Sequence, residues 1–270
     1  MKIRTPFPYY GGKNNLAPWI LSHTPEHTVY VEPFAGSAAV LLAKLESRVE
    51  VLNDLNGDVV NFWRVLRDRH DELVALLQLT PYARDEYLWC RDGKSGTIDP
   101  LERAREFFTR CCMAFNASTG TVGFSASSAA KTAKAHTFRR RIDERLSRVA
   151  ERIRGVEIEN MDALDLIRRW RDPQAVVYLD PPYLGATRNS SSNYATDNGG
   201  AAFHEALMEV IEDFPGTILL SGYDGSPYDR LGWRREEKKV PAHVSNVVGA
   251  ERVECLWINR EAALTTADPG

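Results

Sequence analysis

Apolar and polar positions divide the chain into short β-branched runs that alternate with longer amphipathic stretches, a pattern typical of a mostly parallel α/β sheet. The run 175–179 is apolar throughout, which suits a strand buried on both faces. The expected strands are 28–32, 50–53, 156–159, 175–179, 217–221 and 252–259. The expected helices are 37–47, 57–79, 137–154, 163–171 and 202–213.

Two long segments interrupt this alternation. Residues 57–155 separate the second and third expected strands, which is far more chain than one crossover needs. This segment is helical at first, becomes rich in Ser, Thr, Gly and Ala over 116–135, and ends in a basic helix. The second interruption, 185–200, has the Ser, Asn and Gly content of a mobile loop. The predicted division is a domain of 1–56 and 156–262, an inserted lobe of 57–155, and a flexible tail of 263–270.

The composition indicates a globular protein with a sizeable core, because 43% of the 270 residues are hydrophobic and 26% are charged. No apolar run approaches the ~20 residues that span a bilayer, and the N-terminal residues lack the pattern of a signal peptide. The four cysteines, at 90, 111, 112 and 255, match no zinc-binding spacing. We therefore expect a cytoplasmic protein with reduced, buried thiols, no metal and no membrane partner.

The distribution of charge matters more than the net charge of −3, which on its own disfavours a nucleic-acid partner. From Lys131 to Arg154 the chain holds nine Lys or Arg against three acidic residues. Screening confines charge effects to about 8–10 Å, so a phosphate backbone would meet this local surplus rather than the overall sum. The candidates for DNA contacts in this segment are Lys131, Lys134, Arg139, Arg140 and Arg141.

The sequence Asp180-Pro-Pro-Tyr183 follows directly on the buried strand 175–179, and ligands of open α/β sheets bind at the carboxyl ends of strands. Proline fixes φ near about −65° and donates no hydrogen bond, so the Asp180 carboxylate and the Pro181 carbonyl are two acceptors on a stiff backbone. They could grip both protons of a flat exocyclic amine, while Tyr183 could stack on a base flipped out of its duplex. The alternative is a strand-ending turn that happens to contain two prolines. The predicted catalytic residues are Asp180, Pro181, Pro182 and Tyr183.

The segment 31–40 runs from an expected strand into a turn of small residues, where a nucleoside ligand could approach the backbone closely. The N-terminus of the expected helix after it would favour negative charge. Asp54, which follows the next strand, occupies a position where an acidic residue typically binds ribose hydroxyls. Only one glycine of a dinucleotide fingerprint is present, so an ordinary βα turn is an equal alternative. The cofactor candidates of this region are Glu32, Phe34, Ala35, Gly36, Ser37 and Asp54.

The segment 8–13 combines a glycine pair, which permits a sharp turn, with aromatic and cationic side chains. Tyr9 or Tyr10 can stack on a ligand and Lys13 can meet a carboxylate, although such a segment is also common as a surface turn. Asp162, at the end of the third expected strand, could accept a hydrogen bond from a nucleobase amine, cap the following helix, or do both.

Taken together, these motifs resemble the Dam-type adenine-N6 DNA methyltransferases. The blocks occur in the order of that family and the resemblance runs from Tyr9 to about Asn259. It implies an α/β, Rossmann-like methyltransferase sheet with an inserted, mainly helical target-recognition lobe. The matching blocks are Tyr-Gly-Gly-Lys at 10–13, Glu-Pro-Phe-Ala-Gly at 32–36, Asn-Asp-Leu-Asn at 53–56 and Asp-Pro-Pro-Tyr at 180–183.

The resemblance also implies the reaction: transfer of a methyl group from S-adenosylmethionine to N6 of a flipped-out adenine in double-stranded DNA. The product of the cofactor is S-adenosylhomocysteine, and a restriction endonuclease would be a compatible partner. The cofactor contacts that the resemblance implies are Tyr9 (where the family often has Trp), Lys13, Phe34, Gly36, Asp54, Asp162 and Asp180.

Further DNA contacts come from the resemblance alone. Phe115-Asn116 resembles an aromatic-Asn pair in the recognition region of the family, whereas 117–135 departs from its better-known members. Related enzymes carry a loop and a returning strand near the C-terminus, which makes Ser245, Asn246 and Arg252 candidates for DNA contacts. The alternative for this C-terminal stretch is a hairpin that completes the sheet.

Three other functions stay open. One is a methyltransferase of another amine (cytosine N4, RNA adenine or protein glutamine). The cytosine-N4 and protein-glutamine enzymes use related motifs, usually with Asn or Ser at the position of Asp180. A nicotinamide oxidoreductase is disfavoured by the missing glycine spacing. A catalytically silent DNA-binding protein on the same scaffold is disfavoured by the intact motif and Lys13, and an activity measurement decides it.

Overall fold

The computed structural model describes residues 3–93, 96–115, 123–127, 133–183, 200–241 and 251–260. In these ranges seven strands form a sheet in the order β3-β2-β1-β4-β5-β7-β6. Strands β2 and β3, β1 and β4, and β4 and β5 pair parallel, whereas β7 runs antiparallel to both β5 and β6. The predicted α/β sheet is confirmed. The strands are β1 Val29–Glu32, β2 Val49–Asn53, β3 Glu157–Glu159, β4 Ala175–Leu179, β5 Thr217–Tyr223, β6 Arg234–Pro241 and β7 Glu251–Ile258.

The chain forms two compact units. The first comprises Met1–Pro18, Ala35–Leu45 and Val51–Met161, and the second comprises Trp19–Phe34, Glu46–Glu50 and Asp162–Gly270. The α-helices are α1 Ala17–Ser22, α2 Gly57–Asp68, α3 His70–Leu79, α4 Arg84–Arg91, α5 Pro100–Met113, α6 Lys134–Arg152, α7 Ala163–Arg169 and α8 Ala201–Ile211. The chain also forms the 3₁₀-helices η1 Leu41–Ala43 and η4 Pro227–Leu231.

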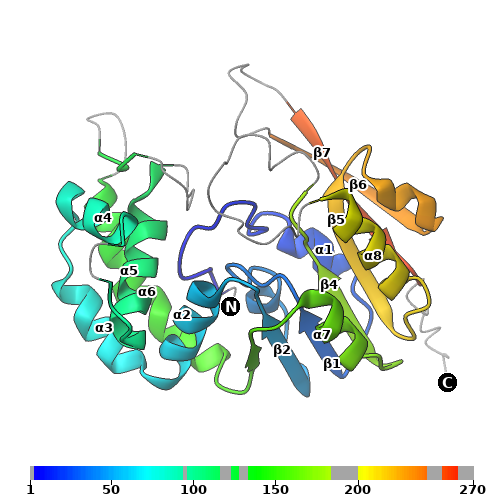
Figure 1. Cartoon of the computed structure of the whole chain (residues 1–270), viewed down its shortest axis with the longest axis horizontal. Coiled ribbons are helices and arrows are strands. Elements are labelled where there is room, and N and C mark those ends of the chain that lie inside the picture. The colour runs from blue at the N-terminus through cyan, green and yellow to red at the C-terminus, as the bar shows by residue number, and fades with distance from the viewer. Residues whose placement is uncertain are drawn as a thin grey trace, which may run out of the picture. The chain divides into compact units, whose positions relative to one another are not determined.

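An aromatic core joins the N-terminal segment to helices α2, α5 and α6 of the first unit, which Figure 1 labels. Phe7 inserts from the N-terminal segment, and its ring centroid lies 4.9 Å from that of Phe62 on α2 and 5.1 Å from that of Phe107 on α5. Phe108 continues the cluster to Phe138 of α6, with 5.7 Å between the ring centroids. Each of these side chains is at most 2% exposed, so aromatic burial fixes the N-terminal segment on the helices.

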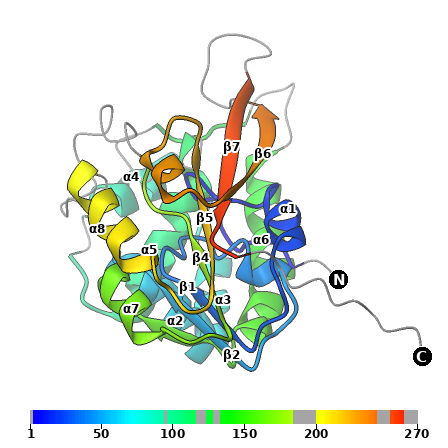
Figure 2. The ribbon, with the colours of Figure 1, turned by 90° about the vertical axis from the view of Figure 1, so that its right-hand side faces the viewer.

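The second unit is built on the parallel strands β1, β4 and β5. All five residues of β4 are buried, which confirms the prediction that 175–179 is a central strand. Helices α7 and α8 lie side by side on one face of β4 and β5 (Figures 1 and 2) and bury Leu166, Ile167, Leu207 and Ile211. The order of the strands reverses between β1 and β4, so ligands are expected beyond the carboxyl ends of these two strands. The residues at those ends are Glu32 and Asp180.

The prediction of a helix at 37–47 is wrong. Only the three-residue η1 forms there, because Gly36 and Ala38 adopt positive φ angles of 45° and 51°, which no right-handed helix accommodates. No helix N-terminus therefore lies at this turn to favour a negatively charged ligand, contrary to what the sequence had led us to expect. The small residues that suggested a helix serve a tight backbone turn instead.

The structure differs from the sequence-based expectation at two further places. The helix expected at 57–79 is broken at Arg69, whose φ of −133° and ψ of 39° separate α2 from α3. Strand β6 was not predicted because Arg234-Arg-Glu-Glu-Lys-Lys239 carries charge at every position instead of an apolar alternation. It is an edge strand, where charged side chains protect exposed backbone groups. The structure thus contains the hairpin that was the alternative for the C-terminal stretch.

Candidate active site

In the first unit, Gly36 is fixed on both sides of its peptide backbone. Its N–H donates to Oδ2 of Asp54 over 2.9 Å, and its carbonyl accepts from Nε1 of the buried Trp63 over 3.0 Å. The neighbouring Ala35 N–H donates to the Asn53 carbonyl over 2.8 Å, and Ser37 is buried as well. The predicted close backbone turn therefore exists, and Asp54 holds it in place.

The ring of Tyr9 covers this turn. A Cβ atom placed on Gly36 would lie 2.8 Å from Cδ1 of Tyr9, so glycine is required both for its φ of 45° and for the aromatic contact. Tyr10 is 62% exposed. Lys13 is 6% exposed, and its Nζ donates to the Gly11 carbonyl over 3.0 Å. The structure thus brings Tyr9, Gly36 and Asp54 together at one turn.

Asp54 is held by backbone donors on both carboxylate oxygens, since Oδ1 accepts from Asn56 N–H over 2.9 Å. Burial raises the pKa of the Asp54 carboxyl to about 6, although the two N–H donors oppose the shift. Asn160 supports the same residue, because its Nδ2 donates to the Asp54 carbonyl over 2.7 Å. Asn53 both donates to and accepts from the backbone of Met161. Two asparagines therefore join the ends of β2 and β3 beneath Asp54.

In the second unit, the predicted catalytic motif emerges at the carboxyl end of β4. Asp180 is partly exposed and Pro181 is buried. The hydroxyl of Tyr183 lies within hydrogen-bonding distance of two carboxylates, 3.1 Å from Oδ1 of Asp180 and 3.2 Å from Oε2 of Glu254. Burial, followed by the charge of Asp180, raises the pKa of Tyr183 well above its usual value, so this hydroxyl is a proton donor at neutral pH. Its ring contacts Tyr223 at a centroid distance of 4.2 Å and an interplanar angle of 65°.

The other cofactor candidates of the second unit have structural partners. Glu32, at the end of β1, is 3% exposed and accepts from the Tyr30 hydroxyl over 3.3 Å. Phe34 packs edge-on against Phe203 of α8, with 6.1 Å between the ring centroids. Asp162 caps α7 as predicted: its Oδ1 accepts from the Leu164 and Asp165 amides over 2.8 and 3.3 Å, and neither of these bonds uses Oδ2.

The DNA-binding candidates are described only in part. Arg139 and Arg140 of α6 are exposed, and Nη1 of Arg139 donates to the Gln78 carbonyl. Arg141 and Lys134 are partly exposed. Arg252 is engaged within β7, as its guanidinium lies 3.3 Å from Oε1 of Glu254. The candidates Asn116, Lys131, Ser245 and Asn246, residues 185–199 of the predicted loop 185–200, and the tail 263–270 lie outside the described residues.

Comparison with known protein families identifies the family that carries these motifs. The model of the D12 class N6 adenine-specific DNA methyltransferases matches residues 9–226, which contain the four blocks at 10–13, 32–36, 53–56 and 180–183. The chain belongs to this family. The predicted family and activity are thereby confirmed: this protein is an adenine-N6 DNA methyltransferase.

Curated relatives are similar over most of their length. This methyltransferase is 27% identical over 233 residues to the DNA adenine methylase of Salmonella typhi, covering 83% of this chain and 82% of that protein. The same identity and coverage hold for the DNA adenine methylase of Escherichia coli strain K12. It is 26% identical over 200 residues to the type II methyltransferase M1.LlaDCHI of Lactococcus lactis, covering 70% of this chain and 69% of that protein.

Several residues that build the site of this methyltransferase were not predicted. Trp63, Asn53 and Asn160 hold the turn and Asp54, and Glu254 contacts Tyr183. Only Glu254 could have been noticed in the sequence. It is the one acidic residue in the otherwise apolar run Val253-Glu-Cys-Leu-Trp257, and a charged side chain in a buried strand is rare unless it has a partner.

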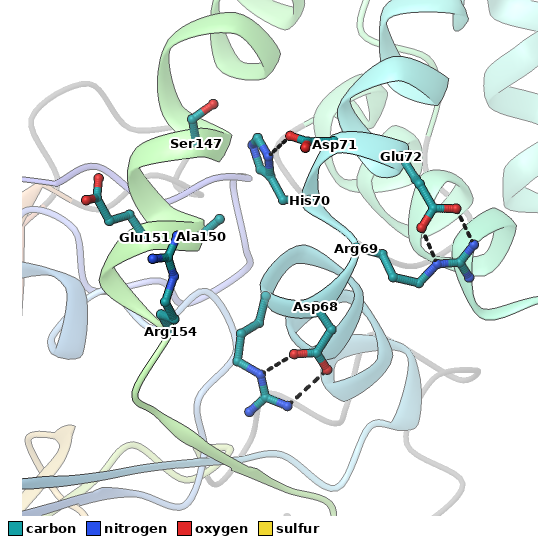
Figure 3. Close-up of a pocket in the computed structure, with 10 residues that line it drawn as sticks. Asp68, Arg69, His70, Asp71, Glu72, Ser147, Ala150, Glu151 and Arg154 are labelled. Carbon is teal, nitrogen blue, oxygen red and sulfur yellow. Dashed lines mark hydrogen bonds and ion pairs between the residues drawn. The ribbon is translucent and has the colours of Figure 1, made fainter.

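A pocket of about 620 Å³ in the first unit involves none of the predicted site residues (Figure 3). The last turn of α2, the start of α3 and the C-terminal half of α6 line it. Six of its polar side chains contact one another within the wall: Arg67 with Asp68 at 2.7 Å, Arg69 with Glu72 at 2.6 Å, and His70 with Asp71 at 2.8 Å. These contacts leave fewer polar groups for a ligand, and we assign the pocket no role.

Neither a metal site nor a membrane-spanning helix is found in the described ranges. These ranges contain no group of three or more His, Cys, Asp or Glu side chains placed to hold a metal ion. None of the helices in the same ranges is long and apolar enough to cross a bilayer. All four cysteines are buried and free, as expected from the sequence, and burial raises the pKa of Cys90 to about 12.

Proposed function

We propose that this methyltransferase transfers a methyl group from S-adenosylmethionine to N6 of an adenine flipped out of double-stranded DNA, and that S-adenosylhomocysteine leaves by direct displacement. The observation that carries the proposal is the position of Asp180-Pro-Pro-Tyr183 at the carboxyl end of β4, beside the reversal of strand order. Open α/β sheets bind their ligands at that point. When bound, the cofactor supplies a methyl group activated by a sulfonium, so positioning accounts for most of the rate.

The turn at Gly36 fits a nucleoside. A glycine that admits no Cβ, a tyrosine ring beside it and an anchored carboxylate provide close backbone approach, a stacking surface and an acceptor for ribose hydroxyls. Asp162 is suited to the adenine amine of the cofactor, because Oδ2 takes no part in the two bonds that cap α7. The residues that would hold the cofactor are Tyr9, Tyr10, Lys13, Glu32, Phe34, Ala35, Gly36, Ser37, Asp54, Asp162 and Asp180.

We assign the two hydrogen-bond acceptors of the motif, one side-chain carboxylate and one backbone carbonyl, to the N6 amine of the target base. The Asp180 carboxylate and the Pro181 carbonyl would each accept a hydrogen bond from one N6–H group, which turns the nitrogen lone pair out of conjugation with the ring. Once the methyl group has moved from sulfur to N6, the cationic N6 releases one of its protons to solvent. Positive charge grows on N6 as it attacks, and a fixed carboxylate stabilises that charge without reorganisation. Pro182 keeps the corner stiff, and Tyr183 is assigned to the base.

The acceptor class is tested by supplying labelled S-adenosylmethionine with unmethylated double-stranded DNA, single-stranded DNA, RNA or total bacterial protein. We expect incorporation into double-stranded DNA to be the fastest, and to disappear when the DNA has been methylated to completion beforehand. Faster labelling of RNA or protein would refute DNA as the substrate.

The affinity for the cofactor is expected to depend on pH through Asp54. Its pKa of about 6 means that the carboxylate is ionised above that pH and becomes neutral below it, where it accepts ribose hydroxyls less strongly. If only the ionised form binds, the dissociation constant rises about tenfold between pH 7.5 and pH 5. Equilibrium dialysis with labelled cofactor measures this change. Asp54→Asn should bind weakly with a flat profile, and an unchanged slope in that variant would assign the titration to another group.

DNA contacts are proposed from the lobe 57–155, which we take as the target-recognition region, and from the C-terminal hairpin. Exposed arginines on α6 suit a phosphate backbone, since each phosphate contact releases counterions. The proposed contacts are Asn116, Lys131, Lys134, Arg139, Arg140, Arg141, Ser245, Asn246 and Arg252. The name of the Lactococcus relative as a type II methyltransferase is compatible with a restriction endonuclease as partner.

Replacing Arg139, Arg140 and Arg141 with glutamine is expected to flatten the salt dependence of DNA binding. The slope of log K against log salt should fall in magnitude by about 0.9 for each phosphate that the variant no longer neutralises. Fluorescence anisotropy over a range of salt concentrations measures it. Arg168→Gln is the matched control, because this exposed arginine of α7 pairs with Asp165 and has no proposed contact with DNA. Equal slopes in the triple variant and the control would place the DNA track elsewhere.

A further inference from the structure

Glu254 is a buried acid beside the catalytic motif. Its side chain is 2% exposed, and β7 places it opposite Tyr223 of β5. Oε1 of Glu254 lies 3.3 Å from the guanidinium of Arg252, and Oε2 lies 3.2 Å from the Tyr183 hydroxyl. A buried carboxylate is costly unless cations and donors compensate it, and here it has both.

Arg252 is itself held in place. Its guanidinium carbon lies 4.9 Å from the ring centroid of Tyr223, whose ring also contacts that of Tyr183. The cation therefore keeps Glu254 paired, and the aromatic contacts link Arg252 back to the motif. This arrangement holds the carboxylate at a fixed position next to the Tyr183 hydroxyl.

The Tyr183 hydroxyl faces a choice between two acceptors. A phenol carries one proton, so a hydroxyl that donates it to Glu254, over 3.2 Å, does not donate it to Asp180, over 3.1 Å. An N6 amine that reaches Asp180 needs the same carboxylate as its acceptor. Without Glu254, the hydroxyl would lose the acceptor that competes with Asp180, and its hydrogen bond would stay on the carboxylate that N6 needs.

We propose that Glu254 is a positioning residue, which accepts the Tyr183 hydroxyl and thereby leaves the Asp180 carboxylate to the target amine. This inference rests on the proposed function, in which Asp180 binds N6. Glu254 does not touch the substrate: it acts by choosing the direction in which the Tyr183 proton points.

Glu254→Gln tests the inference with little change in shape. Its amide oxygen should stay on the Arg252 guanidinium, which leaves the amide Nε2, a donor, facing Tyr183. The tyrosine proton must then point to Asp180 and compete with N6. We expect the single-turnover rate to fall about tenfold, with the affinity for S-adenosylmethionine unchanged and with thermal unfolding measured to show that the variant is folded.

Tyr183→Phe decides whether Glu254 acts through the hydroxyl. Phenylalanine has no proton to place on Asp180, so the double variant Glu254→Gln/Tyr183→Phe should turn over within about twofold of Tyr183→Phe alone. Losses that multiply in the double variant would overturn the inference. Arg252→Lys is the control, because it keeps a cation for the Glu254 carboxylate and so leaves that carboxylate beside Tyr183. Any loss in this control should not be relieved by Tyr183→Phe.

Two further arms keep the outcome decisive. If Glu254→Gln does not fold, Glu254→Asp withdraws the carboxylate from the hydroxyl by one methylene, and the same cycle with Tyr183→Phe is expected. If Asp180→Ala retains normal turnover, the proposed function itself fails. If Asp180→Ala is inactive while the cycle is multiplicative, only the role of Glu254 is refuted.

Discussion

Methyl transfer by the Asp180→Ala variant is expected to be at least about a hundredfold to a thousandfold slower than by the wild type, as is typical when one preorganised electrostatic partner of a transition state is removed. The variant removes the carboxylate assigned to N6, but the Tyr183 hydroxyl can still donate its hydrogen bond to Glu254. The surroundings should therefore stay folded, and DNA binding should be largely kept. Single-turnover labelling of DNA gives the rate, and a filter-binding assay gives the affinity for DNA.

Asp213→Ala is the control for this variant. The Asp213 carboxylate is exposed, pairs with Arg171 at 3.0 Å and has no place in the proposed site. Its rate should stay within about twofold of the wild type, because an exposed ion pair contributes little. Turnover of Asp180→Ala at a comparable level would refute the assignment of N6 to this carboxylate.

The second large effect is expected for Gly36→Ala. The added Cβ atom would lie 2.8 Å from the Tyr9 ring at a backbone φ of 45°, so either the ring or the turn must move. Both belong to the proposed cofactor site. We therefore expect the affinity for S-adenosylmethionine to fall by about a hundredfold, which corresponds to ~2.7 kcal/mol, and the melting temperature to fall as well.

Gly93→Ala separates the two causes. Gly93 has a similar φ of 61°, but a Cβ atom placed there meets no heavy atom within 4 Å. It reproduces the backbone strain without the clash, so a modest drop in melting temperature with unchanged cofactor affinity is expected. Calorimetric titration of both variants with the cofactor measures the difference. Normal affinity in Gly36→Ala would show that the turn does not hold the cofactor.

The sheet could be predicted from the sequence because its central strands are buried on both faces and carry little but apolar residues. β4 is the clearest case, since all five of its residues are buried. The prediction of a helix at 37–47 failed for a physical reason. Alanine favours helices, but it is also small enough for a crowded turn, and Ala38 adopts a φ of 51° there. The break at Arg69 was not predicted because the apolar pattern continues through it from α2 into α3.

The catalytic motif could be predicted because its chemistry lies in four consecutive residues after a strand. The residues that hold it could not, because their partners are distant in the sequence. Trp63 reaches the carbonyl of Gly36 from 27 positions away, and Glu254 reaches Tyr183 from 71 positions away. Asn160 reaches Asp54 from 106 positions away. No local pattern encodes such contacts, since they depend on the pairing of the strands that carry them.

The position of the methyl group on the base tests the central claim most directly. Unmethylated double-stranded DNA would be incubated with the enzyme and labelled S-adenosylmethionine, digested to nucleosides and analysed by chromatography and mass spectrometry. An Asp-Pro-Pro-Tyr corner that holds an exocyclic purine amine predicts that all of the label appears as N6-methyldeoxyadenosine. Label on N4 or C5 of cytosine, or at a ring nitrogen of adenine, would contradict it.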